Sequence, residues 1–431
     1  MRRGISIAAA VAALALGATA CGSDGGDSGG DAAKKPGDVS GSITWWDTSN
    51  STTEAPVYKE LVARFEKKYP KIEVDYVNVP FDQAQNKFKT AASGGKGAPD
   101  VLRSEVGWTP GFAALGYLQK LDGTAAVDST DDFLPGPKAG GQYKGATYGV
   151  PEVTDTLALL YNKKLLKQAG VAKPPTTWDE LKAASLKVKK KTGAMGTYVN
   201  PDAYFAWPFL YGEGTDLVDV PGKKITVNSP EGVKAVETAR GLIASGAAVK
   251  PDLTNGYNNM QADFGAGKVA MIVNGPWSLA DDFKGKAFKD DKSNLGIATV
   301  PAGSTGKAGA PTGGHSLAVY AGSAHRDASY LFVKFMTSAE SQAYVSTKVQ
   351  TLPTRESAYT AEVTKDPTVK AFKEILASAK PRPQLPQGGD LFADFAANYG
   401  KVLLGGQSAK DGVDKTAKAW KQKFLKDFST P

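Results

Sequence analysis

Residues 148–166, YGVPEVTDTLALLYNKKLL, are the most informative stretch of the chain. They read as two short strands, Tyr148–Pro151 and Thr156–Tyr161, with Asp155 between them and a helix beginning after Asn162. The second strand is nearly continuous in apolar residues, which is typical of a strand covered by helices on both faces. Burial of a carboxylate at the start of such a strand costs free energy unless the carboxylate has hydrogen-bonding partners. The fold or a ligand must therefore supply these partners.

Strands and helices alternate upstream of this stretch. This order predicts an open α/β sheet with right-handed crossovers, whose ligands bind beyond the carboxyl ends of the strands. The expected strands are Ser42–Trp46, Ile72–Val79 and Pro99–Leu102, and the expected helices are Glu54–Tyr69, Asp82–Ala92 and Gly107–Leu115.

A second α/β region follows the stretch, and the chain then returns to the first. Ser229-Pro230 is typical of a helix start, with a capping side chain and a proline in the first turn. The expected elements are helices at Thr177–Lys191, Val233–Ile243 and Ala328–Met336, strands at Ile225–Val227, Val269–Val273 and His315–Tyr320, further crossings at Gly296–Pro301 and Thr351–Arg355, and a largely helical Val369–Phe428.

Length and composition limit the class of protein. At 431 residues the chain is too long for one hydrophobic core, so two lobes are expected. Its 41% hydrophobic and 22% charged residues are ordinary for a globular protein. The formal charge of +8 comes from lysines spread along helices, without a basic motif interleaved with aromatics, so no nucleic-acid partner is expected.

The N-terminus has the pattern of an export signal. Arg2 and Arg3 precede an apolar run, Ile5–Ala20, and small residues then lead to Cys21, the only cysteine. This end resembles a bacterial lipobox, which implies a signal peptide at 1–20 and a lipid on Cys21; a plain signal peptide with a stray cysteine is the alternative. The Gly-, Ser- and Asp-rich segment 21–41 is expected to be a flexible tether.

Several motifs carry a family resemblance. Residues 148–166, together with FGAGKVAMIVNGPW, PTGGHSLAVYAG and TLPTRES in this order, resemble the extracellular solute-binding proteins of ABC importers, in particular the maltose-binding branch. The resemblance implies an α/β, two-lobe periplasmic-binding-protein-like fold with three inter-lobe crossings. The expected lobes are 42–153 with 302–353, and 154–301 with 354–431.

Sugar chemistry selects the candidate site residues. A sugar ring offers C–H groups that suit flat aromatic faces and hydroxyls that suit planar polar side chains. Trp277 follows a buried strand and a Gly-Pro turn, and Trp108 opens a helix just after Arg103 and Glu105. For both tryptophans, packing in the core is the alternative to ligand contact. Trp45 and Trp46 alternate along one strand, so at least one of these belongs to the core.

The resemblance adds further candidates. It implies sugar contacts for Asp155, the acidic residue at the crossing, and for Phe392, an aromatic residue near the C-terminus. It also implies a contact for Tyr204, with Asp202 as a weaker candidate. The family pattern has acidic, basic and aromatic residues after the third strand. This chain offers similar side chains at displaced positions, namely Arg103, Glu105 and Trp108. The remaining candidates, each with a structural alternative, are Asp47, Ser49 and Asn50 on the first turn, Gln85 on the second helix and His315 in a Gly-rich strand.

The sequence thus predicts a monomeric receptor that captures maltodextrin-type oligosaccharides for the permease subunits of an ABC importer. It is expected on the extracellular face of the cell membrane, lipid-anchored and without cofactor or metal. A secreted glycoside hydrolase is the alternative from another class, with a carboxylate pair drawn from Glu105, Asp155 and Glu152. A receptor of the same fold for another oligosaccharide, a peptide or an amino acid is a third reading.

Overall fold

The protein is described by a computed structural model that covers residues 35–127 and 131–431. The expected signal peptide and the lipidation site Cys21 lie outside the described residues. Residues 36–431 form one compact unit. Within the described ranges, no helix has both the length and the apolar character needed to span a bilayer.

The first sheet has the strand order β15-β6-β14-β3-β1-β2, with β16 beside β14. β1 runs parallel to β2 and β3, whereas β14 runs antiparallel to β3 and β6. The carboxyl ends of β1 and β3 therefore lie at the same edge. The strands are β1 Gly41–Asp47, β2 Ile72–Asn78, β3 Val101–Glu105, β6 Val150–Thr156, β14 Pro311–Val319, β15 Leu352–Pro353 and β16 Lys380–Pro381.

The second sheet has the order β11-β8-β12-β7-β13. Leu157, Ala158, Leu159 and Leu160 are all fully buried, as expected for a strand covered on both faces. The strands are β7 Ala158–Asn162, β8 Met195–Tyr198, β11 Ala248–Val249, β12 Val269–Asn274 and β13 Leu295–Ala298. Two short pairs lie outside both sheets: β4 Gln142–Tyr143 with β5 Ala146–Thr147, and β9 Val218–Asp219 with β10 Lys224–Ile225.

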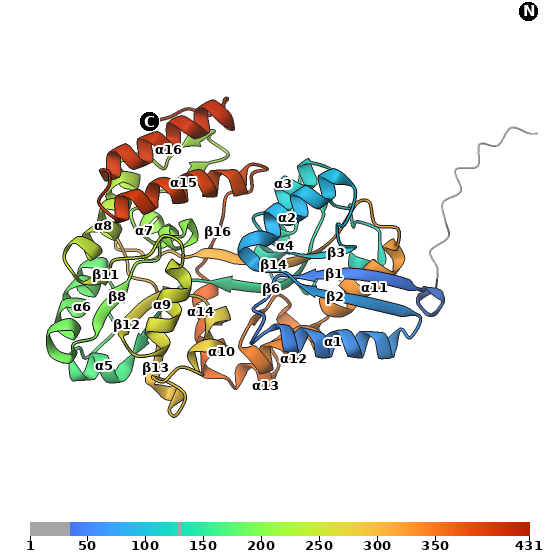
Figure 1. The fold of residues 1–431 in the computed structure, drawn as a ribbon, viewed down its shortest axis with the longest axis horizontal. Helices are drawn as coiled ribbons and strands as arrows, with labels where there is room; N and C mark the ends of the chain where they lie inside the picture. The colour runs from blue at the N-terminus through green and yellow to red at the C-terminus, as the bar shows by residue number, and fades with distance from the viewer. Residues whose placement is uncertain (1–34, 128–130) are drawn as a thin grey trace, which may run out of the picture. The chain divides into compact units, whose positions relative to one another are not determined.

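Helices cover both faces of each sheet (Figure 1). Trp45 packs with α1, α11 and α12 on one face of the first sheet, and Trp46 packs with α2 and α3 on the other, so both tryptophans are core. Helices α5–α8, α15 and α16 cover one face of the second sheet, and α9, α10, α13 and α14 cover the other. The first eight helices are α1 Ala55–Lys68, α2 Phe81–Gly94, α3 Thr109–Ala114, α4 Pro135–Gly140, α5 Lys163–Gln168, α6 Trp178–Thr192, α7 Trp207–Gly212 and α8 Pro230–Ala244. The others are α9 Gly256–Gly265, α10 Leu279–Asp282, α11 Arg326–Met336, α12 Ala339–Val349, α13 Ala361–Thr364, α14 Pro367–Leu376, α15 Gly388–Leu403 and α16 Ala409–Lys423.

Capping side chains set several helix starts. The Ser229 side chain accepts a hydrogen bond from the Gly232 amide at the start of α8, and Asn162 does the same for Leu165 in α5. Both starts were predicted from the sequence.

The structure corrects three expectations. Asp155 lies inside β6 and not between two strands, because β6 pairs through this position with Gly313 of β14, and the chain passes to the second sheet only at Leu157. The strand expected at 225–227 is reduced to β10, outside both sheets. The folded body begins before residue 42, since Val39 is buried in the core.

The chain also adds one strand to the first sheet that the sequence did not predict, β16. After the crossing at β15, α14 packs against the second-sheet core, and β16 then pairs in parallel with β14 at Pro311 and Thr312. The chain goes on to α15 and α16, on the other face of the second sheet. This short strand had no signal in the sequence because only two residues pair.

Candidate ligand-binding site

An aromatic wall lies on the second-sheet side of the crossing strands. Tyr204, in the 3-10 helix Ala203–Ala206, has its ring centroid 6.1 Å from that of Trp277, which belongs to a 3-10 turn after β12. Trp207 links Tyr204, at 6.1 Å, to Phe392 of α15, at 4.8 Å. The three aromatics predicted on this side are thus neighbours in one cluster.

Backbone and hydrogen bonds hold this wall in place. The Asp202 carboxylate accepts a hydrogen bond from the Tyr204 amide at 2.8 Å, which positions the tyrosine. The Trp277 indole donates to the hydroxyl of Tyr257 at 2.9 Å. The indole also lies back over Gly275, where an added Cβ would come within 1.9 Å of the ring. A glycine is therefore needed at this turn for the tryptophan to take this position.

Asp155 meets the aromatic wall directly. Its Oδ1 accepts a hydrogen bond from the Tyr204 hydroxyl at 2.9 Å. Gly313, opposite Asp155 in β14, leaves space for this contact, since an added Cβ would lie 2.2 Å from that oxygen. Burial raises the pKa of Asp155 to about 6, against the opposing effects of the Tyr204 hydrogen bond and the Arg382 charge.

Arg382 lies among the candidate site residues and was not predicted from the sequence. It follows β16 and donates to the carboxylate of Glu105, and its Nε donates to the carbonyl oxygen of Thr312 at 3.3 Å. Its guanidinium carbon lies 5.3 Å from the Tyr204 ring centroid and 5.9 Å from that of Phe392. The local sequence, an arginine between two prolines, did not predict that Arg382 reaches Glu105 and Tyr204, because this placement depends on the pairing of β16 with β14.

Glu105 and Trp108 lie on the first-sheet side. Glu105 ends β3, and its carboxylate also accepts a hydrogen bond from the Gly107 amide at 2.9 Å. Trp108 is 8% exposed, and its ring stacks on Phe81 with centroids 5.2 Å apart. His315 stands opposite Glu105 in the register of β14 and β3, and it meets the Phe81 ring edge-on.

Gln85 lies against the second-sheet side of the molecule. An added Cβ at Gly389, in the first turn of α15, would come within 2.1 Å of the Gln85 amide nitrogen. Helix α2 of the first sheet therefore touches the start of α15 at this point.

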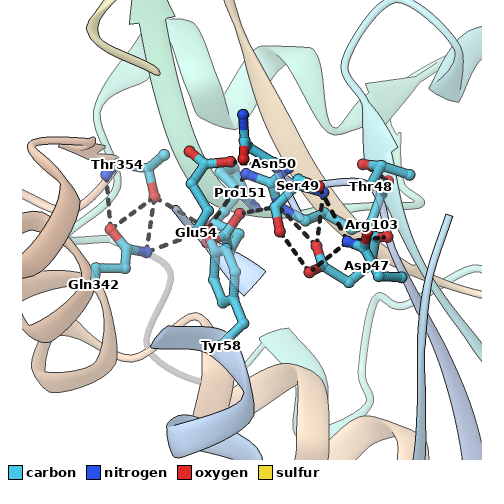
Figure 2. Close-up of polar contacts among 12 residues, drawn as sticks. Asp47, Thr48, Ser49, Asn50, Glu54, Tyr58, Arg103, Pro151, Gln342 and Thr354 are labelled. Carbon is cyan, nitrogen blue, oxygen red and sulfur yellow. Dashed lines mark hydrogen bonds and ion pairs between the residues drawn. The ribbon is translucent and has the colours of Figure 1, made fainter. Parts of the chain in front are cut away.

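Arg103, Asp47 and Ser49 belong to a buried network (Figure 2). The Arg103 Nε lies 2.9 Å from the Glu152 carboxylate, which also accepts from the Tyr58 hydroxyl. Asp47 accepts from the amide and the hydroxyl of Ser49, at 2.9 and 2.5 Å. These side chains make hydrogen bonds inside the protein, because a buried charge must be paired where the strands place it.

Glu54 is a further carboxylate of this network. It is 6% exposed, and it accepts a hydrogen bond from the Asn50 amide at 3.0 Å. Burial raises its pKa to about 7, although the Arg103 charge acts in the opposite direction.

Asn50 itself is exposed and reaches the other side. Its side-chain amide donates to the carboxylate of Asp281 at 2.9 Å, and Asp281 belongs to α10, which follows β12 of the second sheet. Its Oδ1 accepts from the amides of Thr52 and Thr53. Of the first-turn candidates, Asn50 alone bridges the two sides by a side chain.

In the described part of the chain, no group of three His, Cys, Asp or Glu side chains is placed to hold a metal ion.

Comparison with known proteins identifies the family. A model of the family described as bacterial extracellular solute-binding protein matches residues 49–343. The chain belongs to this family. The resemblance predicted from the sequence is confirmed, and so is the two-lobe α/β fold class.

The solute-binding protein has relatives along nearly its whole length. The GacH receptor of Streptomyces glaucescens, solved unliganded and in complex with acarbose, is 47% identical, with a TM-score of 0.87 over 91% of this chain and 100% of that one. The maltotriose-binding protein of Pyrococcus abyssi is 26% identical over 90% of this chain and 83% of its own. A maltooligosaccharide ABC transporter solute-binding lipoprotein of Streptococcus pneumoniae is 27% identical over 76% and 77% of the two chains.

Proposed function

We propose that this solute-binding protein captures maltodextrin-type oligosaccharides and delivers them to the permease of an ABC importer. The observation that carries the proposal is the wall of Tyr204, Trp277 and Phe392 beside the Asp155 carboxylate and the Arg382 guanidinium. Flat rings suit the C–H faces of sugars, and the charged planar groups suit their hydroxyls. The sugar ligands named for the relatives above support the same ligand class.

Capture requires the two lobes to act together. The first sheet supplies Glu105 and Trp108, and the second-sheet side supplies Tyr204 and Trp277. A sugar that contacts both sides binds the closed arrangement more tightly than an open one, and this difference in affinity drives closure. The crossing strand β6 with β7, the returning β14, and β15 and β16 are the segments that bend. We infer two lobes along these crossings, residues 39–156 with 302–353 and residues 157–301 with 354–431, apart from β16, which pairs in the first sheet.

We also infer that Cys21 carries a lipid that holds a monomeric receptor at the extracellular face of the membrane. The small residues before Cys21 support this, and a relative is named a lipoprotein. Two or three acyl chains bind a bilayer durably, because each buried methylene contributes about 0.8 kcal/mol. Replacement of Cys21 by Ser should release the protein from the membrane fraction into the medium.

A ligand panel tests the proposed function. Maltose, maltotriose, maltotetraose, acarbose and a tetrapeptide are added at millimolar concentration, and the melting temperature is measured. The oligosaccharides should raise it and the peptide should not, because only a ligand of the folded state stabilises it. A rise with the peptide alone would overturn the proposal. Release of reducing ends from maltotetraose would show hydrolysis instead of capture.

A further inference from the structure

Phe81 is an exposed aromatic at the edge of the proposed site. Five large hydrophobic side chains are exposed in the described part of the chain, and Phe81, at 49%, is the only aromatic among them. It opens α2, whose buried positions Ala84, Phe88 and Ala92 continue the spacing of Phe81. By this spacing Phe81 would be core, but it lies in the first turn of α2, just after the carboxyl end of β2, and its ring remains half in solvent.

The Phe81 ring is held by its neighbours. It stacks on Trp108 with an interplanar angle of 26° and a centroid distance of 5.2 Å. The His315 ring meets it edge-on at 5.8 Å and 73°. His315 lies in β14 and Trp108 follows the end of β3, so strands of the first sheet set the positions of both neighbours of Phe81.

The same turn faces the second-sheet side of the molecule. Gln85, one helical turn after Phe81 and on the same face of α2, lies against Gly389 at the start of α15. On the flank of Trp108, an added Cβ at Gly111 would lie 2.7 Å from the Pro386 carbonyl oxygen, just before α15. Helix α15 also carries Phe392 of the aromatic wall, so the face of α2 that holds Phe81 and Gln85 touches the helix that supplies this wall residue.

His315, which contacts the Phe81 ring, has a ring nitrogen that could pair with a sugar hydroxyl. The Nε2 of His315 is buried and has no hydrogen-bond partner in the described residues. Burial, together with the charges of Arg103 and Arg382, lowers the pKa of His315 well below its usual range, so the imidazole is neutral. A neutral imidazole nitrogen can donate to or accept from a sugar hydroxyl.

We propose that Phe81 is the stacking platform of the first lobe, and that a pyranose ring of the oligosaccharide packs on the face of Phe81 opposite Trp108. The ligand is then held between aromatic faces of both lobes. This inference rests on the proposed function, since it names one further contact of the same ligand. Phe81 was not among the site residues predicted from the sequence.

Calorimetric titration with maltose, maltotriose and maltotetraose tests the inference. Phe81→Ala should weaken binding of at least one of the three by about tenfold, the loss expected from one flat apolar contact of about 1.4 kcal/mol. Phe81→Tyr retains the flat face and should bind within about threefold of the wild type. Phe81→Leu retains apolar contact with Trp108 without the flat face and should bind as weakly as the alanine variant.

Controls separate the possible failures. Leu186→Ala removes a second exposed apolar side chain, on α6, and should leave binding unchanged. The melting temperature of unliganded Phe81→Leu should stay within a few degrees of the wild type, because the ring is half exposed. Wild-type affinity of both Phe81→Ala and Phe81→Leu for all three sugars would overturn the inference and leave the proposed function standing. Absence of sugar binding by the wild type would instead overturn the proposed function itself.

Discussion

The guanidinium of Arg382 donates to the carboxylate of Glu105 across 277 residues of sequence. Glu105 ends a strand of the first sheet, while the arginine also lies over the ring of Tyr204, 5.3 Å from its centroid. The two side chains are 6% and 14% exposed, so the pair is largely shielded from water. This ion pair joins the edge of the first sheet to the aromatic wall of the second-sheet side.

Arg382→Ala should lower both stability and sugar affinity. The Glu105 carboxylate would be left without its cation in a shielded position, and breaking such a pair costs about 3–5 kcal/mol of unfolding free energy. Urea denaturation measures the loss. The double variant Arg382→Ala, Glu105→Gln should recover part of it, because no unpaired charge remains. Equal stability of the wild type and the single variant would show that the pair contributes nothing.

Gly313→Ala should weaken ligand binding. The new methyl group would lie 2.2 Å from the Asp155 Oδ1 and 2.6 Å from the Tyr204 hydroxyl, so it would separate the two side chains. We expect sugar affinity to fall by at least about tenfold, the equivalent of one lost hydrogen bond. Gly37→Ala is the matched control, since an added Cβ there meets no atom within 4 Å. Equal affinity of the two variants would contradict the placement of Asp155 in the site.

Glu54→Gln should change how stability depends on pH. The pKa of Glu54 is raised from 4.5 to about 7, so the folded state binds more protons than the unfolded state between these values. Stability therefore falls as the pH rises from about 4.5 to 7, and burial of the charged form is fully felt above pH 7. The glutamine variant lacks this loss.

Relative to the wild type, Glu54→Gln should thus be more stable at pH 8 than at pH 5, by on the order of 1–3 kcal/mol. Denaturant titrations at the two pH values measure the difference. Glu73→Gln, which replaces an exposed glutamate, is the control. A stability difference between Glu54→Gln and the wild type that does not vary with pH would show that Glu54 stays charged throughout.

Trp277→Ala should abolish the rise in melting temperature that sugar causes. The indole is only partly buried and rests over Gly275, so the unliganded variant should melt within a few degrees of the wild type. Trp277→Phe keeps a flat face and should retain part of the rise. Unfolding of both variants without ligand would assign the tryptophan to the core, which was the alternative given for it by the sequence.

Local patterns were enough to predict several of the strands and helices. The apolar run at 157–160 and the caps Asn162 and Ser229 are written in neighbouring residues, and each corresponds to a strand or helix start in the structure. The family resemblance was also present in short motifs. The position of Trp277 after a turn and the family resemblance at Tyr204 pointed to these two residues, which the structure brings together.

Local patterns did not predict the hydrogen-bonding partners of the charged candidate residues. Asp47, Ser49 and Arg103 matched the chemistry of a sugar site, but strand register places them in a buried network with Glu152. Asp155 was expected between strands, although pairing with Gly313 places it within one.

Sequence by itself determined the alternation of strands and helices, the family and the kinds of side chain available for a ligand, because these depend on spacing over a few residues. Only the tertiary structure decided which of them meet. Arg382 reaches Glu105 because β16 pairs with β14, and Phe81 stays exposed because its turn lies beyond the end of β2. The pairing of β16 with β14 and the contacts of Phe81 with Trp108 and His315 join segments that are distant in the sequence. Their free energy is set by packing and register and not by local sequence.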